Sequence, residues 1–292
     1  MYQLLTDSAV DLPYQLLADN NVKFVSMHVT IGSSEYTDDL EHHFNLTNFY
    51  QKISQGIMPS TTQINIGQFI EFFKPYVKAN IPILYLGFSS GLSGTFNNAQ
   101  QAKKMLVHAY PNAQIYLVDS LAACCGEGLM LLDAIDRQNS GMKIDELANW
   151  LINNRLHYRQ WFTVDDLNYL YHGGRVSRTS AAVGSLLQIK PVMDVDTRGH
   201  LRPVKKVRSR RRSLEALAAN TVKELENKYD PRILIATSAD DKAARIVRNH
   251  IYKLVPNAQI LLEHIGPTIA SHTGLGLSLI HISEPTRPEP IS

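Results

Sequence analysis

Short apolar runs alternate with helical patterns through the first half of the chain, and this alternation constrains the fold most strongly. "IPILYLGF" and "AQIYLVDS" have the character of buried strands, and the helical patterns "TFNNAQQAKKMLVHAY" and "GEGLMLLDAIDRQ" follow them. Val22–Ile31 is predicted to be one earlier strand. Strands that alternate with helices build a parallel sheet. The sequence therefore predicts an α/β domain with a largely parallel sheet over residues 1–157.

The pattern changes after Arg159. The stretch "QIKPVMDVDTRGHLRPVKKV" predicts a hairpin with Arg198-Gly199 near its tip, and the long helix "RRSLEALAANTVKELENKY" follows it. Further strand and helix patterns continue to about residue 276, which indicates an α+β second domain over residues 158–276.

The final segment, residues 277–292, has a different character. It carries three prolines in its last eight residues, and "LSLIHISEPTR" matches the translation of a transposon-end adapter used in sequencing libraries. We therefore expect residues 277–292 to be a non-native tail outside the fold. The native C-terminus, with one more core strand, would then be missing.

Composition narrows the class of protein. The 292 residues are 44% hydrophobic with a net charge of +2, which suits a globular protein and argues against binding polyanions over the whole surface. The two cysteines, Cys124 and Cys125, are adjacent and expected to be small core residues in a reducing compartment. The N-terminus lacks a signal-peptide pattern, and no apolar run approaches the ~20 residues of a membrane span. A cytoplasmic protein without stable membrane insertion is expected.

The stretch "GFSSGLSGTFNNAQ" contains the G-x-S-x-G pattern of serine hydrolases, centred on Ser89. Asp194 or Asp196 followed by His272 supplies the chain order of a hydrolase triad. However, a second glycine precedes the helix, so the loop can also curl its N–H groups and hydroxyls around an anion at the helix N-terminus. Ser93 and Thr95 are the nearest hydroxyls, and simple N-capping is a third interpretation.

Three further clusters carry polar chemistry. "PSTTQ" places Ser60, Thr61 and Thr62 in a predicted loop, where hydroxyls are usually solvated. "HGGRVS" supplies Arg175, whose planar fork suits a carboxylate or a phosphate. His272 in "IASHTG" could donate to an anion or carry a proton, or be an ordinary loop histidine.

A basic run covers the second half of the predicted hairpin and the start of the following helix. It suggests an acidic protein partner or phosphates, unless it is a solvated face. Nucleic acid is not expected, because no DNA-binding motif or aromatic interleaving accompanies the run. No metal is expected either, because His42 and His43 lack ligand spacing with their acidic neighbours. The seven basic residues are Arg202, Lys205, Lys206, Arg208, Arg210, Arg211 and Arg212.

Taken in order, these motifs resemble the DegV family of fatty-acid-binding proteins, two-domain bacterial proteins that include the FakB subunits of fatty acid kinase. The resemblance extends to about Gly274. It rests on "TDSAVDLP", "PSTTQINIGQF", "GFSSGLSGTFNNAQ", "IYLVDS", "DDLNYLYHGGRVS", "IKPVM" with "KKVRSRRRSLEAL", and "IGPTIASHTG".

The resemblance implies a monomeric carrier rather than an enzyme, with no cofactor. A long-chain fatty acid would bury its acyl chain and hold its carboxylate between the domains. A separate kinase subunit, resembling dihydroxyacetone kinases, would phosphorylate that carboxylate with ATP. The basic run from Arg202 to Arg211 would be the kinase docking face. The implied ligand-binding residues are Thr61, Thr62, Ser93, Gly94 and Thr95, with Arg175 and His272 as second-layer or phosphate-facing groups.

Two positions depart from the family pattern. Ile64 stands where the family usually has proline after "PSTTQ", and Leu275-Gly276 stand where proline and glycine usually follow "SHTG". The second departure adjoins the expected non-native tail.

Overall fold

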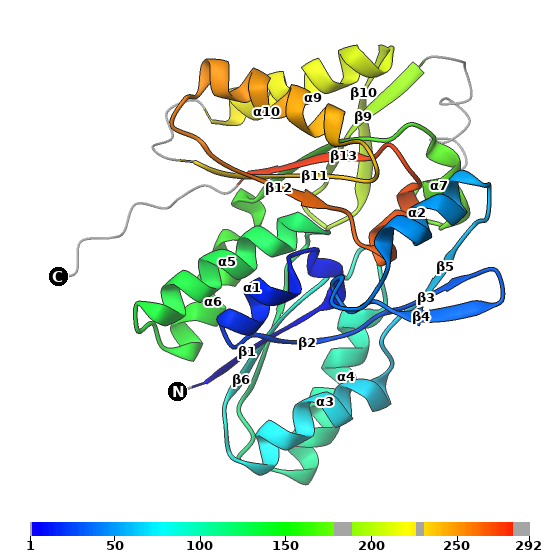
Figure 1. Cartoon of the computed structure of the whole chain (residues 1–292). Coiled ribbons are helices and arrows are strands. Elements are labelled where there is room, and N and C mark those ends of the chain that lie inside the picture. The colour runs from blue at the N-terminus through cyan, green and yellow to red at the C-terminus, as the bar shows by residue number, and fades with distance from the viewer. Residues whose placement is uncertain (1, 178–188, 226–230, 283–292) are drawn as a thin grey trace.

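The computed structural model describes residues 2–177, 189–225 and 231–282, and three sheets organise them (Figure 1). A four-stranded sheet has the order β2-β1-β6-β7, and a six-stranded sheet has the order β10-β9-β8-β13-β11-β12. A small sheet with the order β4-β3-β5 completes the set. The fold is α/β, as predicted.

The four-stranded sheet is parallel throughout, which confirms the prediction for the first domain. All five residues of β6 are buried, as expected for a parallel strand covered on both faces. The strands are β1 (Gln3–Asp7), β2 (Lys23–Val25), β6 (Ile83–Gly87) and β7 (Ile115–Asp119). The helices of this half are α1 (Tyr14–Asp19), α2 (Leu46–Ser54), α3 (Ile66–Lys78), α4 (Thr95–Ala109), α5 (Cys125–Asn139) and α6 (Ile144–Asn154), with short 3₁₀ turns at Ser8–Val10 and Arg155–His157.

The small sheet corrects two predictions. The single strand expected over Val22–Ile31 is two strands, β2 and β3 (His28–Ile31), and β2 joins the parallel sheet. The expected loop "PSTTQ" contains β5 (Ser60–Thr62), which pairs antiparallel with β3, as does β4 (Ser34–Thr37). Local sequence does not reveal β5 because its hydrogen bonds go to a strand about 30 residues away.

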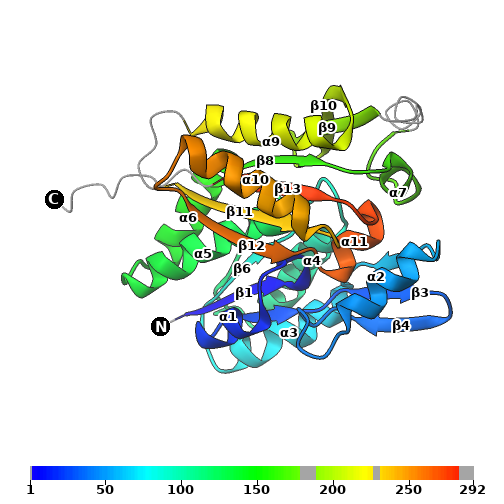
Figure 2. The ribbon, with the colours of Figure 1, turned by 45° about the horizontal axis from the view of Figure 1, so that its top comes forward.

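The six-stranded sheet contains the predicted hairpin. β9 (Ile189–Val195) and β10 (Leu201–Arg208) pair antiparallel, and Gly199 near the tip has a φ of 78°. Figures 1 and 2 show α9 (Arg210–Glu224) and α10 (Asp241–Leu254) covering the outer face of this sheet. The other elements are β8 (Arg159–Thr163), α7 (Leu167–His172), β11 (Arg232–Thr237), β12 (Gln259–His264), α11 (Pro267–Thr273) and β13 (Ser278–Ile282).

The strand β13 corrects the expectation that everything after residue 276 lies outside the fold. β13 lies between β8 and β11 with all five of its residues buried, so it fills a central position in the sheet. Residues 283–292 lie outside the described residues. The non-native origin of the segment stays a prediction.

Helix α5 joins the two large sheets. It packs against β6 on one side and against β11 and β13 on the other. Arg232 of β11 also forms ion pairs with Asp133 and Asp136 of α5, at 3.1 and 2.8 Å. The chain changes sheet between β7 and β8, and the exact domain boundary near residue 157 stays a prediction. In the described part of the chain, no helix combines the length and the apolar character needed to cross a membrane.

Candidate ligand-binding cavity

The loop after β6 is fixed at the carboxyl ends of the parallel strands, where open α/β sheets bind their ligands. The buried carboxylate of Asp7, at the end of β1, accepts hydrogen bonds from the Phe88 N–H at 3.0 Å and the Tyr85 hydroxyl at 2.6 Å. Asp119, at the end of β7, accepts from the Ser90 N–H at 3.1 Å. Two aspartates from the strands on either side of β6 therefore set the path of the loop that carries Ser93.

The side chains of Thr61 and His272 meet although 211 positions separate them in the chain. Thr61 Oγ1 lies 2.7 Å from His272 Nε2. Burial, and secondarily the charge of Arg175, lower the pKa of His272 to about 4, so the imidazole is neutral at pH 7. A neutral imidazole has one N–H, and the Thr61 hydroxyl has one O–H. One of these two hydrogens forms the bond between Thr61 and His272. The other can be donated to an anion.

Arg175 is held beside this pair. Its Nε donates to the Leu92 carbonyl oxygen at 3.1 Å, and its Nη1 donates to the Gly173 carbonyl oxygen. Gly173 also allows the approach of His272, because a Cβ added there would lie 2.3 Å from His272 Nδ1. Gly173, the first glycine of "HGGRVS", is therefore required for the position of His272.

Ser93, Thr61, Arg175 and His272 all line one cavity of about 230 Å³. The cavity lies between the loop after β6, α11 and the inner face of the six-stranded sheet. Most of its other walls are hydrocarbon. The apolar lining residues are Met27, Phe88, Leu92, Ala123, Phe162, Leu170, Val195, Leu201, Ile269, Leu277 and Leu279, and the remaining ones are Gln63, Cys124, Gln160, Thr268 and Thr273.

Three residues predicted to contact the ligand do not line the cavity. Thr62 is exposed, because side chains alternate along β5 and Thr61 faces inward. Thr95 is fully buried behind the wall, where its hydroxyl accepts from Ser93 Oγ at 3.0 Å, so it positions Ser93. Gly94 is the exposed N-cap residue of α4 and lies under the Gln63 side chain. The structure thus places these three residues outside the cavity lining, and their role as ligand contacts stays a prediction.

Ser89 does not have the surroundings of a nucleophile. It is fully buried, and its Oγ donates to the Gly199 carbonyl oxygen at 3.0 Å, which ties the loop to the hairpin tip. The triad partners expected for it are engaged elsewhere. His272 meets Thr61, Asp194 forms an ion pair with Arg202, and Asp196 accepts from the N–H groups of Arg198 and His200. The geometry does not assemble the predicted triad.

The predicted basic docking face is mostly exposed. Lys205, Lys206 and Arg208 lie exposed on β10, an edge strand of the six-stranded sheet. Arg202 and Arg211 are also exposed, although each has an acidic partner, Asp194 and Glu215 respectively.

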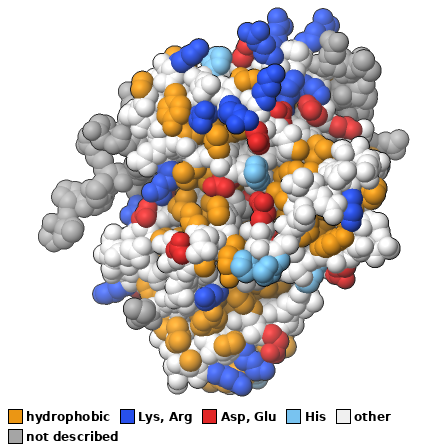
Figure 3. All heavy atoms as spheres, viewed as in Figure 1, with side chains coloured by type: hydrophobic (Ala, Val, Ile, Leu, Met, Phe, Trp, Pro, Cys, Tyr) orange, Lys and Arg blue, Asp and Glu red, His pale blue; other side chains and the backbone are white. Residues whose placement is uncertain are grey.

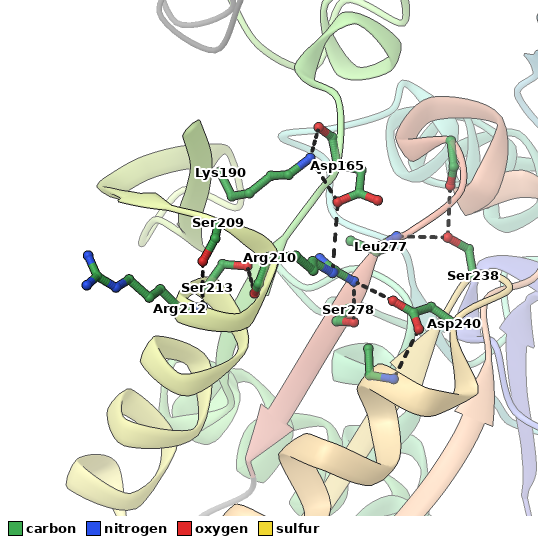
Figure 4. Close-up of polar contacts among 12 residues, drawn as sticks. Asp165, Lys190, Ser209, Arg210, Arg212, Ser213, Ser238, Asp240, Leu277 and Ser278 are labelled. Carbon is green, nitrogen blue, oxygen red and sulfur yellow. Dashed lines mark hydrogen bonds and ion pairs between the residues drawn. The ribbon is translucent and has the colours of Figure 1, made fainter. Parts of the chain in front are cut away.

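Arg210 departs from the prediction for this face. Its guanidinium turns inward, where Nη2 lies 3.2 Å from Asp240 Oδ2 and donates to Ser278 Oγ at 2.8 Å (Figure 4). Asp165 lies on its other side, at 3.9 Å from Nε. Arg210 thus connects α9 to the neighbouring strands and is not part of the free surface.

The cysteines are buried, as predicted, and Cys124 also lines the cavity. Within the residues that the structure describes, Cys124, Cys125 and His281 each place a potential metal ligand within 4.8 Å of the others. His281 belongs to the segment that resembles an adapter, so we assign no metal to this group. Both ring nitrogens of His281 are buried without a hydrogen-bond partner in the described structure.

Comparison with known proteins identifies the family. The sequence profile of the DegV family, described as "Uncharacterised protein, DegV family", matches residues 1–284. The chain belongs to the DegV family. A DegV domain-containing protein of Clostridium perfringens is 39% identical over 288 residues, which cover 98% of this chain and 99% of the relative.

Two solved DegV structures have the same fold. The Thermus thermophilus protein is 26% identical, with a TM-score of 0.87 over 97% of this chain and 99% of its own, and its structure is reported under the words "Fatty Acid Binding". DegV of Bacillus subtilis, called a fatty acid binding protein, is 25% identical, with a TM-score of 0.84 over 96% of this chain and 98% of its own. The predicted family and fold are confirmed.

Several residues that line the cavity or anchor its loop were not predicted from the motifs. Asp7 and Asp119 lie within the motifs "TDSAVDLP" and "IYLVDS". Each is the last residue of a strand of the parallel sheet, and this position was a signal for a role as a loop anchor. Gln63 and Gln160 line the cavity, but no local pattern distinguishes them. The departure at Ile64 is accommodated because its side chain is fully buried and its carbonyl oxygen accepts from Asn98 Nδ2 at 2.8 Å.

Proposed function

We propose that this protein binds a long-chain fatty acid in the cavity, with the carboxylate at Thr61, Ser93 and His272. The contact of Thr61 with His272 carries the proposal, because it places a pair of hydrogen-bonding groups in the wall of a largely apolar cavity. The fatty-acid binding attributed to the two DegV structures supports it.

The energetics agree with a carrier. Each buried methylene contributes roughly 0.8 kcal/mol, so the acyl chain supplies most of the affinity. Hydroxyl donors hold a carboxylate without a fully buried ion pair, while Arg175 supplies a nearby positive charge. The Ser93 hydroxyl, which donates to Thr95 without the ligand, would rotate to donate to the carboxylate. The ligand would therefore be retained by its tail and oriented by its head.

We further propose that the protein presents the carboxylate to a separate ATP-dependent kinase subunit and does not itself catalyse the phosphorylation. The docking face would comprise Arg202, Lys205, Lys206, Arg208 and Arg211. Figure 3 shows Lys and Arg side chains gathering over the part of the molecule where α9, α10 and β10 lie. Such a surface suits an acidic protein partner. We place this carrier in the cytoplasm as a monomer, where the two thiols would remain reduced.

The kinase step has a direct assay. The palmitate-loaded protein is mixed with ATP and a fatty acid kinase subunit of the dihydroxyacetone-kinase-like type, and acyl-phosphate is trapped with hydroxylamine. We expect product only when all three components are present. We expect K205E/K206E to slow its formation at least tenfold while the bound lipid is retained, because the charge that attracts the partner is reversed.

Lys104→Glu provides the control, because Lys104 is exposed on α4, away from β10. It should leave the rate unchanged. Equal rates for K205E/K206E and the wild type would overturn the docking face. Absence of product with a kinase that is active on another DegV protein would overturn the presentation role.

A further inference from the structure

We propose that Gln160 and Val195 form the end wall of the acyl cavity and thereby limit the length of the bound chain. This inference rests on the proposed fatty-acid binding. Both residues line the 230 Å³ cavity, and both also line a second cavity of about 70 Å³. They therefore separate the two cavities.

Strand register explains how the wall is built. β8 and β9 pair antiparallel with Trp161 opposite Asp194 and Phe162 opposite Met193. Continuing that register by one residue places Gln160 opposite Val195. Side chains of directly opposed residues lie on the same face of a sheet, about 5 Å apart. Gln160 and Val195 thus cover adjacent positions on the face that lines the cavity.

Gln160 is held in place by hydrogen bonding. Its side chain is only 6% exposed, and its Oε1 accepts from the Ala123 N–H at 3.0 Å. That bond connects β8 to the segment before α5, so the amide is fixed across the end of the cavity.

The second cavity is unsuitable for hydrocarbon. Its lining includes Arg155, Arg159 and Arg202 with Asp194 and Asp196. A methyl terminus that entered it would remove water from charged groups without replacing their hydrogen bonds. An acyl chain should therefore end at Gln160 and Val195 rather than continue past them.

The test uses delipidated protein that is offered an equimolar mixture of saturated fatty acids with 12 to 20 carbons, and mass spectrometry of the extracted lipid. Gln160→Ala and Val195→Ala each vacate side-chain volume at the wall, which additional methylenes can fill without entering the charged second cavity, so each should shift the bound mixture toward longer chains. Two additional buried methylenes would raise the retained ratio of long to short acid about tenfold. Gln160→Met, which keeps the bulk of the side chain, should give the wild-type distribution.

The outcomes separate the two proposals. The wall is overturned if wild type, Gln160→Ala and Val195→Ala retain the same distribution of chain lengths. If the wild type retains no fatty acid of any length, the proposed function fails, and the wall fails with it. Val195→Ala leaves the Gln160 hydrogen bond in place, so it decides the question even if Gln160→Ala does not fold.

Discussion

Thr61 and Thr62 are consecutive residues of β5 with opposite surroundings, and this gives a test at the scale of single residues. Thr61 lines the cavity and contacts His272, whereas Thr62 is exposed. Thr61→Val should weaken fatty acid binding about tenfold or more, because a hydrogen bond to a charged group contributes roughly 1.5–3 kcal/mol. Titration with a fluorescent fatty acid measures the change.

Thr62→Val is the matched control and should bind like the wild type. The same comparison is available in the next loop, where Ser93→Ala should weaken binding and Ser90→Ala, at an exposed serine outside the cavity lining, should not. Equal affinities for the two threonine variants would remove Thr61 from the carboxylate site.

His281 gives a prediction about pH. Complete burial lowers its pKa to about 3. The unfolded chain therefore binds this proton at a higher pH than the folded chain, and stability is lost as the pH falls from about 6.5 toward 3. At pH 5 the loss amounts to about 2 kcal/mol. His281→Leu should remove that loss and also relieve two unsatisfied buried nitrogens.

Urea unfolding at pH 7.5 and pH 5 checks this prediction. His281→Leu should be more stable than the wild type at both pH values, with a larger difference at pH 5. The exposed His250 provides the control, and His250→Gln should change neither value by much. A difference for His281→Leu that shrinks at pH 5 would contradict a buried neutral histidine.

At the scale of elements, α11 matters most, because it carries His272 and is fixed by the N-terminal half. Asp38 accepts from the Thr268 hydroxyl, Asp11 accepts from the Gly266 N–H at 3.1 Å, and the Tyr50 hydroxyl donates to the Ile265 carbonyl oxygen. These contacts set the position of the helix relative to β5. They therefore determine whether His272 reaches Thr61.

Asp38→Ala should lower stability by about 1–3 kcal/mol at pH 5 and weaken fatty acid retention, because Thr268 loses its acceptor. Burial raises the pKa of Asp38 to about 7. The folded state thus binds this proton more tightly, so the stability contributed by the aspartic acid is lost as the pH rises from about 4 to 7. The cost of the substitution should accordingly be smaller at pH 8.

Urea unfolding at both pH values measures the effect, with the exposed Asp19→Ala as the control. A cost for Asp38→Ala that increases from pH 5 to pH 8 would show that the carboxyl is not buried in its neutral form.

Elements with a strong local pattern were predictable, and elements defined by distant pairing were not. The parallel strands and the β9–β10 hairpin follow from apolar runs and turn residues. β5 is three residues long and exists through its pairing with β3, so "PSTTQ" alone indicated a loop. The motifs indicated Thr61 and Ser93, but the exposure of Thr62 depends on the direction of each side chain, which a motif does not show. The inward turn of Arg210 likewise depends on tertiary contacts with Asp240 and Ser278.

At the scale of the whole molecule, the cavity exists because two sheets approach each other around α5 and α11. The polar side takes Thr61 and Ser93 from the N-terminal half and Arg175 and His272 from the C-terminal half. The same junction contributes the apolar walls, including Leu277 and Leu279 of the C-terminal segment. Ligand binding should therefore stabilise the two halves together, in proportion to the affinity of the ligand.

The measurement that tests the central claim most directly is mass spectrometry of lipid extracted from the purified wild-type protein. We predict one long-chain fatty acid per protein chain, and a lower amount from a Thr61→Val/Ser93→Ala variant purified in the same way. Recovery of no fatty acid from several independent preparations, together with no binding of added palmitate, would contradict it.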